Sequence, residues 1–233
     1  MVTAGPGSGN HRGGPAGALG LGSNRMRGMT VTLVDHPLAG HLLAQLRSKD
    51  TPPPVFRTLA KRLALALALE AIRDVPTTKI AVQTPLEETT GRVLGDLVAV
   101  PILRAGLGML EAVTELFPEV AVGYIGLERD EASLQPQSYY RKLPPVRGRH
   151  VLVLDPMLAT GGSGSAATSA VKEGDPASIR FVCVVSAPEG LERMQEDHPD
   201  VPIFTAAIDR QLNEHGYILP GLGDFGDRLF GTE

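Results

Sequence analysis

Residues 151–163 decide the fold, and they read Val-Leu-Val-Leu-Asp-Pro-Met-Leu-Ala-Thr-Gly-Gly-Ser. Four apolar residues at the start predict a buried strand that ends at Asp155. Two adjacent glycines then mark a tight turn, and residues 162–173 form a helix-forming stretch. The sequence therefore predicts a strand, a glycine-rich turn and a helix in succession, which is the repeating unit of an α/β fold.

The turn in this unit has the parts of a phosphate site. The backbone N–H groups of Gly161 and Gly162, the hydroxyls of Thr160 and Ser163 and the positive end of the helix dipole would hold a phosphate monoester. Asp155 is placed to accept hydrogen bonds from sugar hydroxyls or to help hold hydrated Mg²⁺. The alternative is an ordinary strand-to-helix connection with a capping hydroxyl.

Two phosphate-binding motifs do not fit this turn. The dinucleotide fingerprint needs its first glycine directly after the strand, whereas six residues and Gly161 precede Gly162 here. A Walker loop needs a lysine after its last glycine, and the sequence has no lysine between Lys142 and Lys172.

Strand-like and helix-like segments alternate on both sides of this unit. The pattern predicts an α/β fold in which a mainly parallel sheet is covered by helices on both faces. In such sheets, ligands bind beyond the carboxyl ends of the strands. The expected strands are residues 80–84, 93–101, 120–125, 150–154, 179–185 and 202–208, and the expected helices are residues 55–73, 107–117, 162–173 and 189–196.

Composition separates an extension from the rest of the chain. The chain has 233 residues, 27 glycines and a formal net charge of −4. Residues 1–28 hold nine of those glycines, three arginines and no acidic residue, so we expect a disordered extension, with Met29 as a possible alternative start. The remainder, residues 29–233, is expected to form one domain with 19 basic and 26 acidic residues, a charge of −7.

Charge and hydropathy also limit the kinds of partner that we expect for this chain. An acidic body lacks the broad positive field that non-specific nucleic-acid binding requires, and the longest apolar run, residues 63–69, is too short to span a membrane. The single cysteine, Cys183, lies in an apolar run and fits a reducing compartment, for which we expect the cytoplasm. Neither nucleic acid nor membrane is expected as a partner.

Three further segments could carry chemistry. The first is residues 100–108, where Arg104 and two glycines follow a predicted strand and could grip a diphosphate. The second is residues 128–142, a polar stretch with three cations that we expect to form a flexible lid hairpin. The third is residues 213–228, an irregular wall, neither helix nor strand, whose main chain could hydrogen-bond a planar heterocycle. Each segment also has an ordinary explanation: Arg104 could be a surface arginine, residues 128–142 a solvated loop, and residues 213–228 a C-terminal tail.

These segments together resemble the uracil phosphoribosyltransferase family. The resemblance is carried by Pro-Ile-Leu-Arg-Ala-Gly-Leu-Gly-Met at 101–109, by Asp-Pro-Met-Leu-Ala-Thr-Gly-Gly-Ser at 155–163, by Ala-Pro-Glu-Gly at 187–190 and by Leu-Asn-Glu-His-Gly-Tyr-Ile at 212–218. It extends over about residues 34–233. It implies the parallel-sheet fold of the type I phosphoribosyltransferases, with a lid hairpin and an irregular C-terminal base-binding segment.

The resemblance also implies a reaction and its residues. Uracil and 5-phospho-α-D-ribose 1-diphosphate (PRPP) would give UMP and diphosphate in pyrimidine salvage, with Mg²⁺ bound through PRPP and water rather than by the protein directly. Arg104, Asp155 and Asp224 are the implied catalytic residues, with Asp224 near the metal. The implied uracil contacts are Ile218, Gly223, Asp224 and Phe225. The implied PRPP contacts are Arg104, Arg129, Asp155, Pro156, Met157, Leu158, Ala159, Thr160, Gly161, Gly162, Ser163 and Asp224.

Three positions depart from the family pattern. Phe225 stands where alanine is common, Glu128 stands where an aromatic residue is common, and Ala132 replaces a usual acid. Two other functions stay open at this point: a non-catalytic PRPP-sensing regulator, and a phosphoribosyltransferase for another base. The family resemblance suggests a homo-oligomer, a dimer or larger, and GTP as a possible activator.

Overall fold

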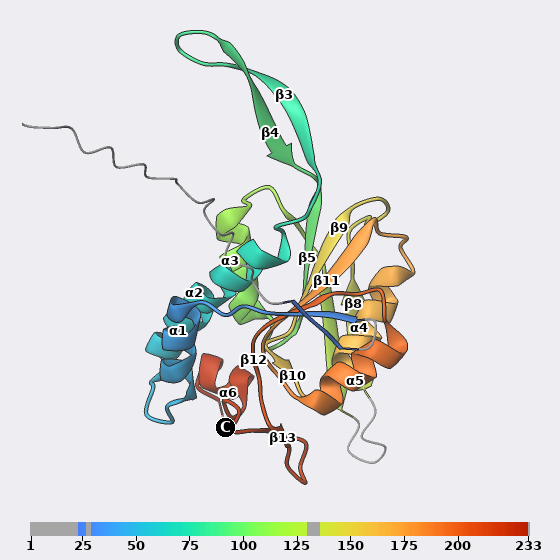
Figure 1. The fold of residues 1–233 in the computed structure, drawn as a ribbon. Helices are drawn as coiled ribbons and strands as arrows, with labels where there is room; N and C mark the ends of the chain where they lie inside the picture. Colours follow the sequence, from blue (N-terminus) through green and yellow to red (C-terminus); the bar gives the residue numbers. More distant parts are fainter. Residues whose placement is uncertain (1–22, 27–28, 130–135, 233) are drawn as a thin grey trace, which may run out of the picture.

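The computed structural model describes residues 23–26, 29–129 and 136–232. Its centre is a twisted sheet in the order β1-β2-β12-β11-β9-β5-β7-β8, with the short strands β10 and β6 paired to β11 and β5 (Figure 1). The strands from β2 to β7 along this order pair in parallel, and the outermost pairs, β1–β2 and β7–β8, are antiparallel.

The strands and helices of this body follow the predicted alternation. The central strands are β5 (Leu97–Leu103), β7 (Tyr124–Arg129), β9 (His150–Leu154), β11 (Ser178–Ser186) and β12 (Ile203–Ile208), with β2 (Met29–Leu33) beside β12, β8 (Pro136–Lys142) beside β7, and the short strands β6 (Ala121–Val122) and β10 (Met157–Leu158). The helices are α1 (Pro37–Arg47), α2 (Pro53–Ala71), α3 (Leu107–Leu116), α4 (Gly162–Lys172), α5 (Pro188–Asp197) and α6 (Phe225–Phe230). The predicted α/β class with a mainly parallel sheet is confirmed.

Alternate residues of the strands supply two separate cores. Leu152 and Leu154 of β9 face the cluster formed by α1, α2, α3 and α6, whereas Val151 and Val153 face the cluster formed by α4 and α5. Helices therefore cover both faces of the sheet, as Figure 1 shows. Such strands are buried on both sides, which explains why their sequences are continuously apolar.

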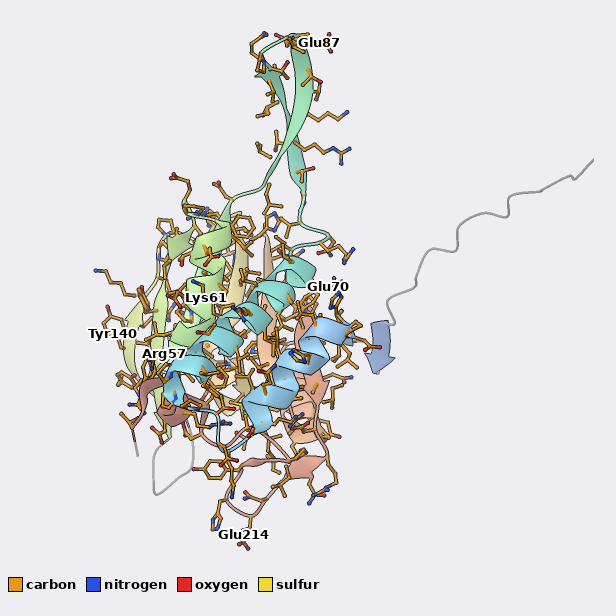
Figure 2. All side chains as sticks on the ribbon, turned by 90° about the vertical axis from the view of Figure 1, so that its left-hand side faces the viewer. Arg57, Lys61, Glu70, Glu87, Tyr140 and Glu214 are labelled. Carbon is orange, nitrogen blue, oxygen red and sulfur yellow. The ribbon has the colours of Figure 1, made fainter. Side chains whose placement is uncertain are left out.

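Two predicted strands lie elsewhere than expected. All of the expected strand 80–84 except Thr84 belongs to β3 (Thr77–Gln83), which among the described strands pairs only with β4 (Glu88–Leu94), in a two-stranded hairpin outside the central sheet. The expected strand 93–101 is divided at Gly95 and Asp96, so that its first part lies in β4 and its second part in β5. Figures 1 and 2 show the hairpin projecting from the body, with Glu87 at its tip.

The C-terminal segment is more regular than predicted. We expected residues 213–228 to contain neither helix nor strand, which is wrong: β13 (Gln211–Leu212) pairs with β14 (Ile218–Leu219), and α6 follows. Asp224 caps α6, because its side chain accepts a hydrogen bond of 2.9 Å from the backbone N–H of Asp227. Gly231, with φ of +71°, ends the helix.

The N-terminal strand β1 (Ser23–Met26) pairs antiparallel with β2. These four residues fall in the part of the chain that we expected to be a disordered extension. Residues 1–22 and 27–28 lie outside the described structure, and the division of the chain at residue 28 stays a prediction. Among the described residues, none of the helices combines the length and apolarity that crossing a bilayer requires.

Candidate active site

Two of the predicted ligand-binding segments follow neighbouring strands of the sheet. β5 and β9 pair in parallel, with Pro101 opposite Leu154, so both strands end at the same edge. Arg104 follows the end of β5, and Asp155 follows the end of β9. The sheet thus places the predicted diphosphate-gripping turn beside the predicted phosphate loop, at the edge where parallel sheets bind ligands.

The phosphate loop, residues 155–163, is held by main-chain hydrogen bonds to β11 and its following turn. The carbonyl of Pro156 accepts from the N–H groups of Val184 and Val185, and the carbonyl of Leu158 accepts from that of Ala187. Pro156 and Leu158 are buried, whereas Thr160 is exposed and Ser163 is half-buried. The loop therefore anchors its apolar side chains inward and presents its turn to solvent.

The turn of this loop leads directly into a helix. Gly161 has a φ of +77°, a conformation that other residues rarely adopt, and it precedes the first residue of α4. The N-terminus of α5 packs behind the loop, because a Cβ at Gly190 would lie 2.5 Å from the carbonyl oxygen of Ala159 and 2.7 Å from that of Leu158. The backbone N–H groups at Gly161, Gly162 and Ser163 are thereby set at a helix N-terminus, which suits an anion.

Asp155 is a half-buried carboxyl group between these segments. Burial raises its pKa to about 7, and the backbone N–H of Met157, 3.4 Å from its Oδ1 atom, opposes that shift only in part. A carboxyl group that titrates near neutral pH at the end of a strand is typical of a functional position.

Arg104 projects from the turn between β5 and α3, and the peptide bond that joins it to Leu103 is cis. Its Nη2 atom lies 3.0 Å from Oδ1 of Asp227 in α6, and its guanidinium lies 5.9 Å from the ring centroid of Phe230. More than half of its side chain is exposed. The structure therefore joins the turn at Arg104, which we predicted to grip a diphosphate, to the C-terminal segment.

A cavity of about 200 Å³ connects that segment to the phosphate loop. It brings together the four predicted uracil residues, Ile218, Gly223, Asp224 and Phe225, with Met157 and Ala159 of the loop. Pockets for drug-sized ligands begin at about 300 Å³, so this cavity suits a smaller ring. Its other lining residues, which the sequence did not single out, are Ala105, Gly216, Tyr217 and Gly226.

Each of those four residues lies within two positions of a predicted site residue. Ala105, Gly216 and Tyr217 lie in the motifs at 101–109 and 212–218, and Gly226 lies in the segment 213–228, so these stretches were the signal that could have found them.

The hairpin that we predicted to be a lid is present as β7 and β8, which pair antiparallel from Tyr124 opposite Lys142 to Arg129 opposite Pro136. Its action as a lid stays a prediction. Arg129 ends β7, and its side chain lies outside the described structure, as do Glu128's side chain and residues 130–135, including Ala132. The predicted role of Arg129 therefore stays a prediction.

The donors near the cavity suit a metal that is held mainly by its ligand. Among the described residues, no group of three or more His, Cys, Asp or Glu side chains could hold a metal ion. Asp155 and Asp224 each offer carboxylate oxygens at the site, although Asp224 uses Oδ1 to cap α6. Mg²⁺ commonly keeps several waters and binds through one or two carboxylates and substrate phosphates, so these residues fit it.

Comparison with known proteins identifies the family. The family model described as uracil phosphoribosyltransferase matches residues 33–232. The chain belongs to this family. A uracil phosphoribosyltransferase of Dictyoglomus turgidum is 52% identical over 206 residues, which cover 87% of this chain and 100% of that protein. That of Thermus thermophilus is 51% identical over 208 residues, which cover 88% of this chain and 100% of that protein.

A solved structure has a similar fold. The AQ2163 protein of Aquifex aeolicus superposes with a TM-score of 0.84 at 38% identity, over 87% of this chain and 99% of that one. The family, the phosphoribosyltransferase-type fold and the enzyme class predicted from the sequence, a glycosyltransferase of the pentosyltransferase kind, are confirmed.

Proposed function

We propose that this chain transfers the 5-phosphoribosyl group of PRPP to uracil and releases UMP and diphosphate, as a step of pyrimidine salvage. The observation that carries the proposal is the cavity of about 200 Å³ that joins the phosphate loop to the C-terminal segment. A small ring in this cavity would lie beside a ribose whose 5-phosphate occupies the turn at Gly161–Ser163.

In this reaction the bond between C1′ of the ribose and the diphosphate oxygen breaks, and a bond from C1′ to N1 of uracil forms with inversion. The proton that N1 loses passes to the departing diphosphate or to solvent. Positive charge develops on the ribose and negative charge on the leaving diphosphate. Arg104 is exposed at the edge of the site and can stabilise the leaving group bidentately. Arg129 is proposed to assist it from the lid hairpin.

The phosphate loop is proposed to hold the substrate at the other end. Residues Asp155–Ser163 would bind the ribose 5-phosphate through the N–H groups at the start of α4, and Asp155 would accept hydrogen bonds from the ribose hydroxyls. Asp224 would contact PRPP and its metal. When bound, Mg²⁺ would supply Lewis-acid neutralisation of the diphosphate charge.

Uracil is proposed to be recognised largely by main-chain groups of Ile218 and of Gly223–Phe225. The ring of Phe225 packs edge-on against Phe56, and the residue as a whole is only 1% exposed, so we place the base against its backbone rather than its ring. The aromatic residue in place of alanine is therefore compatible with uracil binding. We further propose a cytoplasmic homo-oligomer, with GTP as a candidate activator.

A radiolabelled uracil-to-UMP assay with PRPP and Mg²⁺ tests this function. The wild-type chain is expected to form UMP, and Arg104→Ala is expected to lower the rate by roughly tenfold or more, since it removes charge stabilisation from the leaving group. Binding of PRPP without UMP formation would instead identify a PRPP-sensing regulator. An unchanged rate in Arg104→Ala would contradict the role given to that residue.

A further inference from the structure

Asp227 is the residue that connects the diphosphate-gripping turn to the base-binding segment. Its Oδ1 atom accepts hydrogen bonds from Nη2 of Arg104 at 3.0 Å and from the hydroxyl of Thr232 at 2.6 Å. Arg104 and Asp227 are 123 positions apart in the sequence, so this contact exists only because α6 folds back beside the β5–α3 turn. The sequence placed Asp227 in the predicted wall at 213–228 but gave its side chain no role.

The contact is built from two side chains on one face of α6. Asp227 and Phe230 are three residues apart in the helix, a spacing that places them as neighbours on its surface. The guanidinium of Arg104 meets both, with the carboxylate at 3.0 Å and the ring centroid of Phe230 at 5.9 Å. One charged and one aromatic contact together limit the directions that this side chain can take.

Stability does not explain the ion pair. The side chains of Arg104 and Asp227 are 57% and 31% exposed, and ion pairs at such positions contribute little to the free energy of unfolding. The cap of α6 does not use the carboxylate of Asp227, whose second partner is the hydroxyl of Thr232 just after the helix. The helix is capped by the side chain of Asp224, and its end is closed by hydrogen bonds to the backbone carbonyl of Asp227.

We propose that Asp227 is a positioning residue for the phosphoribosyl transfer, and that its carboxylate holds the Arg104 guanidinium at the edge of the cavity, ready for the diphosphate. The same short helix is capped by Asp224, which lines the cavity beside Phe225 and Gly226. Asp227 therefore links the orientation of the leaving-group arginine to the segment that binds the base. This proposal rests on the proposed function, because it takes the diphosphate as the ligand of Arg104.

A double-mutant cycle separates this role from a general effect on folding. The variants are Asp227→Ala, Arg104→Ala and the double variant, and the measurements are kcat/KM for PRPP and the affinity for inorganic diphosphate with Mg²⁺ by calorimetry. In the wild-type background, Asp227→Ala is expected to lower kcat/KM for PRPP and the affinity for diphosphate by roughly tenfold each. In the Arg104→Ala background, the same substitution is expected to change each quantity by less than about twofold.

Two further variants control the experiment. Asp227→Asn keeps an oxygen that can accept from Arg104 and Thr232, so it is expected to restore both measurements to within about threefold of wild type. Glu115→Ala removes the carboxylate of another partly exposed ion pair, with Lys61 at 2.6 Å, on the helices α3 and α2. It is expected to leave both measurements unchanged, because neither Glu115 nor Lys61 lines the cavity. Figure 2 labels Lys61 on α2.

The two readouts distinguish this proposal from the function on which it rests. If the wild-type chain makes no UMP while the diphosphate cycle is non-additive, the proposed function is wrong and the role of Asp227 stands. If the effects of Asp227→Ala and Arg104→Ala multiply independently in both measurements, Asp227 does not act through Arg104 and the proposal is overturned. A wild-type chain that does not bind diphosphate overturns it as well.

Discussion

Phe225 lies edge-on against Phe56, with ring centroids 5.0 Å apart and an interplanar angle of 67°. Both rings are fully buried, one at the start of α6 and the other in the first turns of α2. The neighbouring Arg228 covers the Phe56 ring at 4.4 Å and donates to the carbonyl of Leu222. The aromatic ring of Phe225 thus fastens the C-terminal segment to the core.

Phe225→Ala is therefore expected to lower the free energy of unfolding by about 3–5 kcal/mol, because it empties a packed site beside Phe56. It is also expected to raise KM for uracil more than KM for PRPP, since the segment that it loosens lines the cavity. Urea unfolding and steady-state kinetics measure the two effects. Phe225→Leu, which retains much of the volume, should lose less stability, and equal midpoints for wild type and Phe225→Ala would contradict the packing argument.

Gly190→Ala is expected to weaken PRPP binding by roughly tenfold, because its Cβ would press on the carbonyl groups of Ala159 and Leu158 and displace the phosphate loop. Gly40→Ala is the matched control. This glycine lies in α1 with open space around its Cβ position, so the change should leave binding intact and stabilise the helix by up to about 1 kcal/mol. Equal PRPP affinities for the two variants would show that the loop does not depend on this close approach.

The raised pKa of Asp155 predicts a pH dependence of stability. Its carboxyl group titrates near pH 4 in an unfolded chain and at about 7 in the fold, so the folded state retains the proton longer. The stability contributed by Asp155 is then fully present below about pH 4 and is lost as the pH rises through about 7. Thermal unfolding of wild type and Asp155→Asn from pH 4 to pH 8 measures it. As the pH rises, the midpoint of the wild type should fall relative to that of Asp155→Asn. A difference between the two midpoints that does not change with pH would argue against the raised pKa.

Asp155→Asn is also expected to weaken PRPP binding, because the amide replaces a carboxylate that would accept from two ribose hydroxyls. Calorimetry with PRPP and Mg²⁺ measures the change. Unaltered affinity would contradict the assignment of Asp155 to the ribose.

A chain that starts at Met29 is expected to retain full activity. The deletion removes β1, which among the described strands pairs only with β2 at the edge of the sheet, far from the carboxyl ends of β5 and β9 in the strand order. Comparison of kcat/KM for uracil between the two chains tests this. Loss of activity would show that residues 1–28 contribute to the folded enzyme.

The sequence predicted those parts of the fold that are encoded by neighbouring residues. The run before Asp155 is apolar on every residue because β9 is buried on both faces, and the glycines after it mark the turn into α4. The β3–β4 hairpin escaped prediction as a separate unit because its residues are exposed and its threonines and charges give no core-facing pattern. The helix α6 has six residues, fewer than two turns, so it leaves no helical periodicity in the sequence.

The long-range contacts of the site could not be predicted in the same way. Neither the pairing of Arg104 with Asp227 nor the packing of Phe225 on Phe56 leaves a signal in local composition, because each joins segments more than 100 positions apart. The family motifs predicted residues that line the cavity, whereas the side chains that these residues contact became known only from the fold.

The most direct test of uracil phosphoribosyl transfer is a panel of bases given to the purified chain with PRPP and Mg²⁺. Uracil, hypoxanthine, guanine and adenine are supplied separately, and nucleotide and diphosphate are quantified by chromatography. The account predicts UMP and diphosphate in equal amounts with uracil and no nucleotide with the purines. Absence of UMP, or formation of a purine nucleotide faster than UMP, would contradict it.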